Sequence, residues 1–188
     1  MSTTLLNRKL DRAFAHVDAD GSGSIGRDDL LGLGARILVG FGESPTSPAG
    51  SRLAGGIEEI WRTLTAQLGA RGDAISPGGS GAISPEEFRA GMTSAFVEGD
   101  RFEAVFEPAA AALAGLCDTD GDGAVGPDGF WVLMDAFGTP REDAAAAFAR
   151  LDGDGDGAVS VGELVEATRQ FYTSADPDVA GNWLFGPL

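Results

Sequence analysis

The sequence predicts an all-α fold of four helix–loop–helix units in two pairs, with a short β-bridge between the loops of each pair. Acidic loop segments with a common order of aspartates and glycines recur along the chain, which indicates an internal repeat. Apolar residues at helical spacing flank each segment, so each loop is expected to join two amphipathic helices. A β-branched residue occupies the same position in every loop and is expected to pair with its counterpart in the neighbouring loop: Ile25 with Ile83, and Val125 with Val159.

The segment from Asp152 to Glu163 has every feature of the twelve-residue calcium loop of an EF hand. Calcium is a hard cation that takes about six to eight oxygen ligands, which this loop provides from positions 1, 3, 5, 7, 9 and 12. Gly157 lies at position 6, where the chain turns sharply. An acidic solvated turn is the alternative, but it gives no reason for all of these positions to match. The predicted ligands are the side chains of Asp152, Asp154, Asp156 and Glu163, the carbonyl of Ala158, and Ser160 through a water molecule.

A second loop, residues 18–29, follows the same pattern with a different last ligand. Position 12 is Asp29, which is one methylene shorter than glutamate and reaches a metal less easily with both oxygens. We therefore expect a lower coordination number and a shift in preference toward the smaller Mg²⁺. The alternative is a capped helix turn without an ion. The predicted ligands are the side chains of Asp18, Asp20, Ser22 and Asp29, with the carbonyl of Ser24.

A third loop, residues 118–129, matches the calcium-loop pattern in its first half but lacks the last ligand, because position 12 is Gly129. Two interpretations stay open: a weakened metal site completed by water, or a half-loop that only pairs with its neighbour. Since the missing carboxylate is the visible defect, Gly129→Glu is expected to strengthen this site. The predicted ligands are the side chains of Asp118, Asp120 and Asp122 and the carbonyl of Ala124.

The remaining unit is recognisable only by the second half of its loop, residues 80–87. Counting back from Glu87 places Ser76 and Gly78 at positions 1 and 3, where neither supplies a charge. We expect this hand to be silent and to serve by presenting Ile83 to Ile25. A distorted loop rescued by Asp73 is the alternative.

The spacing of the four loops predicts two pairs and a tail. We expect an N-terminal pair over residues 1–98, a C-terminal pair over residues 99–175, and a tail over residues 176–188 that packs between or against them. The first pair is the longer one, because it contains a Pro/Gly/Ser-rich insertion over residues 42–51.

Composition excludes several classes of function. The net charge of −16 disfavours nucleic acid as a partner, because a phosphate backbone would be repelled. His16 is the only histidine, so a histidine-based catalytic site is not expected, and we expect that the protein is not an enzyme. Cys117 is the only cysteine, so an internal disulfide is not expected. The N-terminus lacks an apolar signal core and no segment is long enough to span a membrane, so a cytoplasmic location is expected.

The chain resembles the sarcoplasmic calcium-binding protein family, and especially its bacterial, calerythrin-like branch. The resemblance rests on the four hands with a silent second one, the Asp at the end of the first loop, and the tail from Asp176 to Gly186. It implies a compact protein whose C-terminal segment folds against the hand pairs, and a cytosolic role as a calcium buffer or transporter. The family has a functional third loop, from which Gly129 departs.

We expect each chain to bind two or three Ca²⁺ ions, with Mg²⁺ competing above all at residues 18–29. We also expect the protein to be a monomer and to have no membrane partner. The rival hypothesis is a calcium sensor that binds a target protein. Sensors of this type open a Met-rich groove, and this chain has three methionines including the first residue. Its tail carries Trp183, Leu184 and Phe185, which need to be buried and would leave a target helix no room.

Overall fold

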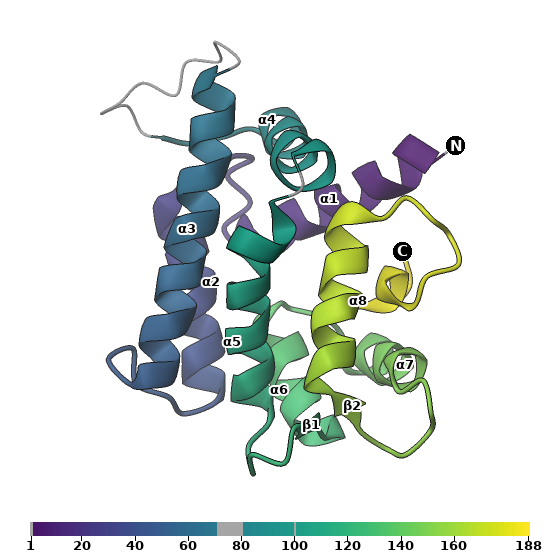
Figure 1. The fold of residues 1–188 in the computed structure, drawn as a ribbon. Helices are drawn as coiled ribbons and strands as arrows, with labels where there is room; N and C mark the ends of the chain where they lie inside the picture. Colours follow the sequence, from purple (N-terminus) through teal and green to yellow (C-terminus); the bar gives the residue numbers. More distant parts are fainter. Residues whose placement is uncertain (1, 71–80, 100) are drawn as a thin grey trace.

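The computed structural model describes residues 2–70, 81–99 and 101–188, and structural statements refer to this part of the chain (Figure 1). The described residues are mostly helical, so the predicted all-α fold is confirmed. Ser76, Gly78 and Asp73, on which the expectation of a silent loop depends, lie outside the described residues. The α-helices are α1 (Ser2–Val17), α2 (Arg27–Gly40), α3 (Pro48–Ala70), α4 (Pro85–Met92), α5 (Glu107–Cys117), α6 (Pro127–Ala136), α7 (Arg141–Leu151) and α8 (Val161–Thr173).

Short β-bridges join the loops in pairs, as the sequence predicts. Strand β1 (Ala124–Val125) runs antiparallel to β2 (Val159–Ser160) and places Val125 opposite Val159. Ile25 and Ile83 form an isolated antiparallel bridge, with N–H···O distances of 2.9 and 2.8 Å. All four side chains are fully buried, so each loop of a pair is tied to its neighbour by both backbone hydrogen bonds and apolar packing.

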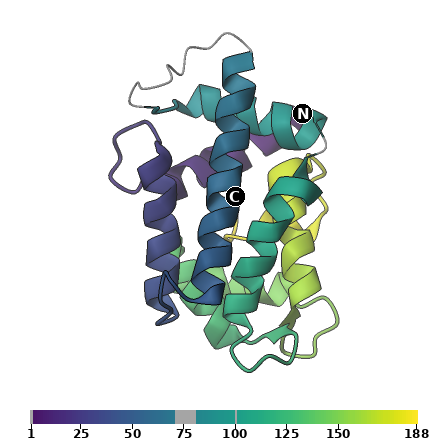
Figure 2. The same cartoon turned by 60° about the vertical axis from the view of Figure 1, so that its left-hand side comes forward.

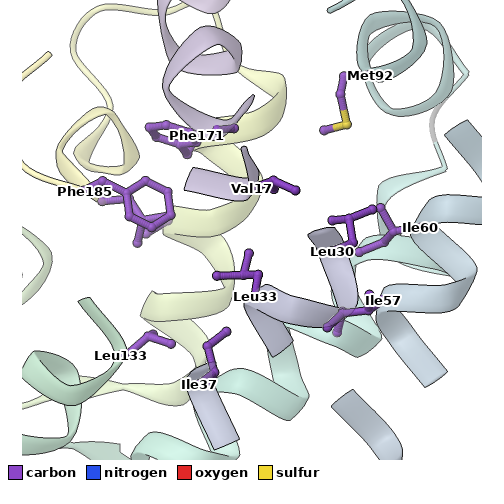
Figure 3. Close-up of a cluster of buried hydrophobic side chains, with 14 of the residues drawn as sticks. Val17, Leu30, Leu33, Ile37, Ile57, Ile60, Met92, Leu133, Phe171 and Phe185 are labelled. Carbon is purple, nitrogen blue, oxygen red and sulfur yellow. The ribbon is translucent and has the colours of Figure 1, made fainter. Parts of the chain in front are cut away.

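The apolar faces of the helices meet in one hydrophobic core. Helix α3 lies beside α2 and α5, and α2 also packs on α6 (Figure 2). Figure 3 shows side chains from several of these helices pointing toward a common centre, among them Leu33, Ile57 and Leu133. Among the described helices, none is long and apolar enough to cross a membrane.

The connection between α4 and α5 is not regular α-helix. Residues Thr93–Glu98 and Phe102–Phe106 form two π-helical segments, η1 and η2, although their apolar spacing had predicted ordinary helix. Phe106 stacks on Phe102 with ring centroids 5.3 Å apart and meets Phe96 edge-on at 5.5 Å. The wider π turns therefore gather aromatic rings between the two halves of the chain.

The C-terminal tail is packed on the core, as predicted. After a short 3₁₀ turn, η3 (Ala180–Trp183), the side chains of Leu184 and Phe185 are 3% and 5% exposed. Trp183 is half-buried and lies under the guanidinium of Arg150, 4.7 Å from the ring centroid. The tail thus adds apolar surface to the core rather than extending into solvent.

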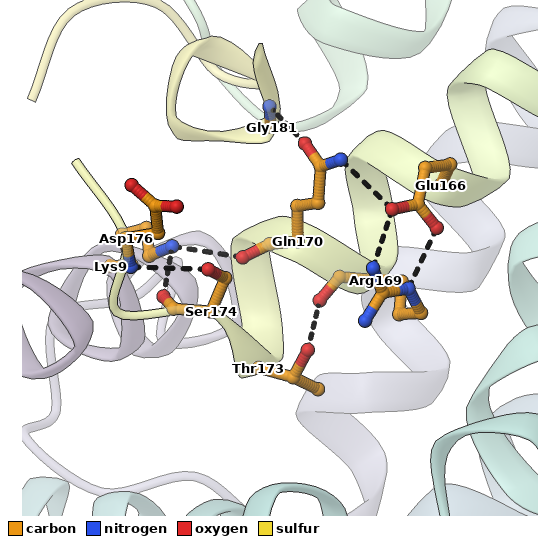
Figure 4. Close-up of polar contacts among 8 residues, drawn as sticks. All are labelled: Lys9, Glu166, Arg169, Gln170, Thr173, Ser174, Asp176 and Gly181. Atoms are coloured by element: carbon orange, nitrogen blue, oxygen red, sulfur yellow. Dashed lines mark hydrogen bonds and ion pairs between the residues drawn. The ribbon is translucent and has the colours of Figure 1, made fainter. Parts of the chain in front are cut away.

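Lys9, the one lysine in the sequence, attaches helix α1 to α8 and the tail. Its side chain is completely buried, and its Nζ donates to the carbonyl oxygens of Gln170 and Ser174 at 2.9 and 2.6 Å (Figure 4). A third hydrogen bond, of 2.9 Å, reaches Oδ1 of Asn182 in the tail. All three donors of the ammonium group are therefore satisfied away from water, as a buried charge requires.

Candidate metal sites

The loop between α7 and α8 gathers its first three predicted ligands. The side chains of Asp152, Asp154 and Asp156 each offer an oxygen within 4.8 Å of the others. Backbone N–H groups hold the first of them: Asp152 Oδ1 accepts from Gly155 at 2.8 Å, and Oδ2 accepts from Gly157 at 3.1 Å. Both glycines have positive φ, 75° and 90°, which is why the chain can turn its N–H groups inward here.

Glu163, the predicted bidentate ligand, already has a structural role at the end of the same loop. Its Oε2 accepts hydrogen bonds from the backbone N–H and the hydroxyl of Ser160, at 2.9 and 2.8 Å, and so caps α8. Its Oε1 lies 3.5 Å from the place a Cβ would take on Gly153, so the carboxylate reaches back toward the start of the loop. Glu163 therefore lies near the start of the loop, but it is not one of the three carboxylates that converge within 4.8 Å.

The loop between α5 and α6 repeats the first half of this arrangement. Asp118, Asp120 and Asp122 bring carboxylate oxygens within 4.8 Å of one another. Asp118 accepts from the N–H groups of Gly121 at 2.8 Å and Gly123 at 2.9 Å, as Asp152 does in its own loop. The two paired loops therefore present nearly the same three-carboxylate cluster.

The end of this loop corrects the expectation for Gly129→Glu. A Cβ on Gly129 would lie 2.4 Å from the carbonyl oxygen of Cys117, which is far inside van der Waals contact with the backbone of α5. The loop therefore lacks both the last ligand and the room for one. A glutamate at this position has to push α6 away from α5, and we no longer expect it to strengthen the site.

Because α6 approaches α5 so closely at Gly129, even the methyl side chain of alanine is expected to lower stability at this position. Gly129→Ala is expected to lower the free energy of unfolding by about 1–3 kcal/mol, because the helices cannot separate without disturbing the core. The matched control is Gly115→Ala in α5, where a Cβ meets nothing within 4 Å and the change is expected to be stabilising. Urea unfolding of both variants measures the difference. Equal stabilities would show that α6 moves away freely.

The loop between α1 and α2 is held by hydroxyl as well as backbone contacts. Asp18 Oδ1 accepts from the N–H of Ser22 at 2.9 Å, and the Ser22 hydroxyl lies 2.9 Å from the carbonyl oxygen of Ser24. Hydrogen bonds from the backbone and hydroxyl of Ser22 hold the pKa of Asp20 below its ordinary value. Asp29 Oδ2 accepts from the N–H of Gly26 at 2.7 Å. Unlike the carboxylates of the other two loops, Asp18, Asp20 and Asp29 do not form a group of three within 4.8 Å of one another.

The second role of position 12 was missed from the sequence, although its signal was present. In three loops the carboxylate at this position accepts the N–H of position 9: Asp29, Glu87 and Glu163 each cap the following helix. Ser84 and Glu87, like Ser160 and Glu163, form the Ser-x-x-Glu capping box. The same carboxylates thus connect each loop to the start of its exiting helix.

The donor chemistry fits a hard divalent cation. Every predicted ligand is an oxygen, and the three aspartates of each cluster converge within one coordination shell. Asp120, Asp122, Asp154 and Asp156 are exposed, so an ion could enter directly from solvent. Repulsion among these clustered carboxylates favours a cation in their midst.

Comparison with known proteins agrees with this chemistry. The family model for the EF hand matches residues 144–167. A calcium-binding protein of Streptomyces coelicolor, described in the context of prokaryotic calcium-mediated regulation, is 35% identical and has a TM-score of 0.73, with 89% of this chain and 98% of that chain covered. The chain belongs to the calerythrin-like family of EF-hand proteins.

Other relatives extend this comparison. Calerythrin of Saccharopolyspora erythraea is 28% identical over 174 residues, which cover 92% of this chain and 94% of calerythrin. The photoprotein clytin shares the fold, with a TM-score of 0.75 at 19% identity over 97% of this chain and 93% of that chain. This member of the calerythrin-like family is thus a calcium-binding EF-hand protein.

Proposed function

We propose that the chain acts as a cytosolic calcium buffer or transporter of bacterial origin. Its two principal sites are the loops 18–29 and 152–163, and the cluster at Asp118, Asp120 and Asp122 is a weak third site. Residues 1–98 and 99–175 act as two hand pairs, with the tail, 176–188, packed against them. The observation that carries this proposal is the burial of Leu184 and Phe185, which occupy the space that a target helix would need.

The surface also favours a buffer over a sensor. A sensor exposes a Met-rich apolar groove when loaded, but Met92 and Met134 are 1% and 0% exposed here. Among the described residues, the exposed large hydrophobic side chains are Val39 and Val97. Moving the tail to open a groove would require breaking the hydrogen bond of Lys9 to Asn182 in the tail.

Calcium binding stabilises the folded chain in this proposal. The cation replaces repulsion between clustered carboxylates with ligation, and the bridges Ile25–Ile83 and Val125–Val159 couple the paired loops. Because only the folded loops form complete sites, each occupied site adds about 2.7 kcal/mol when free calcium is a hundredfold above its dissociation constant. Asp29, with its shorter reach, makes 18–29 the loop at which Mg²⁺ competes best.

An apolar fluorescent dye distinguishes a buffer from a sensor. For a buffer, dye fluorescence falls or stays constant when calcium is added, because loading tightens the loops over an already closed core. The variant Phe185→Ala, which loosens the tail, serves as the positive control and is expected to bind more dye. A calcium-dependent rise in dye binding by the unmodified chain would contradict the buffer and favour the sensor.

A further inference from the structure

The interior contains an apolar cavity of about 100 Å³ between the helices of both halves and the tail. Its walls include Leu33 and Ile57 from the first half, Leu133 from the second, and Phe185 from the tail (Figure 3). These four residues are between 3% and 8% exposed, so this part of the wall belongs to the core. Native interiors have few voids larger than a water molecule, and a void of this size is costly to stability.

One wall of the cavity carries a polar group with nothing described to pair with it. Tyr172 lines the cavity from α8, and no described residue hydrogen-bonds to its hydroxyl. Its ring is fixed by Phe106 and Phe171, with centroids 4.5 and 5.2 Å away. Burial raises the pKa of the Tyr172 phenol, so it stays neutral and can donate a hydrogen bond.

A second polar atom lies one helical turn away. Thr168 also lines the cavity, and its Oγ1 donates its proton to the carbonyl oxygen of Leu164 at 2.8 Å. This hydroxyl can therefore only accept a further hydrogen bond, while Tyr172 can donate one. Among the described residues, the lining contains no charged side chain, so a charged guest would be left without a partner.

We propose that this cavity binds a small neutral aromatic molecule, with one ring and one hydroxyl group that hydrogen-bonds to Tyr172. The size limits the guest to a single ring, since an engineered apolar cavity of about 150 Å³ in another protein, which is larger than this one, binds benzene. An apolar guest restores the dispersion contacts that the empty wall lacks. A hydroxyl on the ring satisfies the phenol of Tyr172, which water in such an apolar space would do poorly.

The tail closes the cavity and sets the route of entry. Leu184 and Phe185 line the space, and Phe185 packs against His16 and Phe137 with centroids 4.5 and 4.9 Å apart. Arg12 donates to the carbonyl oxygens of Phe185 and Gly186, at 3.0 and 3.2 Å. A guest that enters past the tail has to break these contacts transiently, so slow association is expected.

The test is a titration of the calcium-loaded full chain with phenol and with benzene, followed through the methyl NMR signals of Leu33, Ile57 and Leu133. We expect saturable shifts with both probes. Tyr172→Phe keeps the shape and is expected to weaken phenol binding roughly two- to tenfold while leaving benzene unchanged. Ala110→Leu fills the cavity from α5 and is expected to abolish both; if it fails to fold, Ala13→Leu fills it from α1.

The possible outcomes test separately whether the cavity binds a guest and whether Tyr172 hydrogen-bonds to it. If neither probe gives saturable shifts in the unmodified chain, the cavity is not a binding site. If Tyr172→Phe binds phenol as tightly as the unmodified chain, the assigned hydrogen bond is wrong. Calcium stoichiometry is measured on every variant, so that a loss of probe binding with intact calcium binding reports on the cavity alone.

Discussion

Glu163→Gln is expected to weaken calcium binding at the loop 152–163 by on the order of a hundredfold, because it removes one negative charge and one of two ligating oxygens. The fold should survive the change. The glutamine side chain keeps a carbonyl oxygen that can accept the N–H of Ser160, the hydrogen bond that caps α8 at 2.9 Å in the unmodified chain. The expected result is therefore loss of tight calcium binding at the loop 152–163, with nearly unchanged helix content.

The silent hand provides the matched control. Glu87 accepts the N–H of Ser84 at 2.7 Å and caps α4 in the same way, but we predict no ion in its loop. Glu87→Gln is thus the same chemical change in the same local structure, and calorimetry is expected to find calcium affinity and stoichiometry unchanged. Equal losses in both variants would mean that the carboxylates act through helix capping and not as ligands.

Lys9→Met is expected to lower the free energy of unfolding by about 3 kcal/mol, the largest effect on stability that we predict. Burial lowers the pKa of Lys9 to about 8, which still leaves the ammonium charged at neutral pH. Removing it leaves the carbonyl oxygens of Gln170 and Ser174 and Oδ1 of Asn182 without their donor in a dry environment. Urea unfolding at neutral pH with excess calcium measures the change.

The control for Lys9→Met is Arg8→Met on the same helix. Arg8 is exposed, so its replacement removes the same charge and adds the same side chain without breaking a buried contact. We expect it to change stability by less than about 0.5 kcal/mol. Similar losses in the two variants would show that the effect comes from net charge and not from the attachment of the tail.

The loops and their pairing were predictable from the sequence because they depend on local chemistry. The order of Asp and Gly from Asp152 to Gly157 determines both the turn and the direction of its N–H groups. A β-branched residue at one fixed position predicted the bridges of Ile25 with Ile83 and Val125 with Val159. Ligation at these loops stays a prediction, although the first three aspartates of the loops 118–129 and 152–163 lie together as expected.

Other features depend on distances between helices, which a sequence does not contain. In the sequence, Gly129 looks only like a missing ligand. The 2.4 Å that would separate a Cβ on Gly129 from the carbonyl oxygen of Cys117 depends on how closely α6 approaches α5. Nothing in the sequence around Lys9 indicates burial, and only the fold places three acceptors around it, from α8, Ser174 and the tail. The cavity beside Tyr172 likewise arises from packing between the two halves of the chain.

A calcium titration by calorimetry, with and without millimolar Mg²⁺, tests the central claim most directly. We predict two ions bound tightly per chain, with Mg²⁺ reducing the apparent affinity more at 18–29 than at 152–163, and a weak third event at most. Paired with Glu163→Gln, the titration assigns one of the tight ions to its loop. No tight binding, or a stoichiometry left unchanged by Glu163→Gln, would contradict the account.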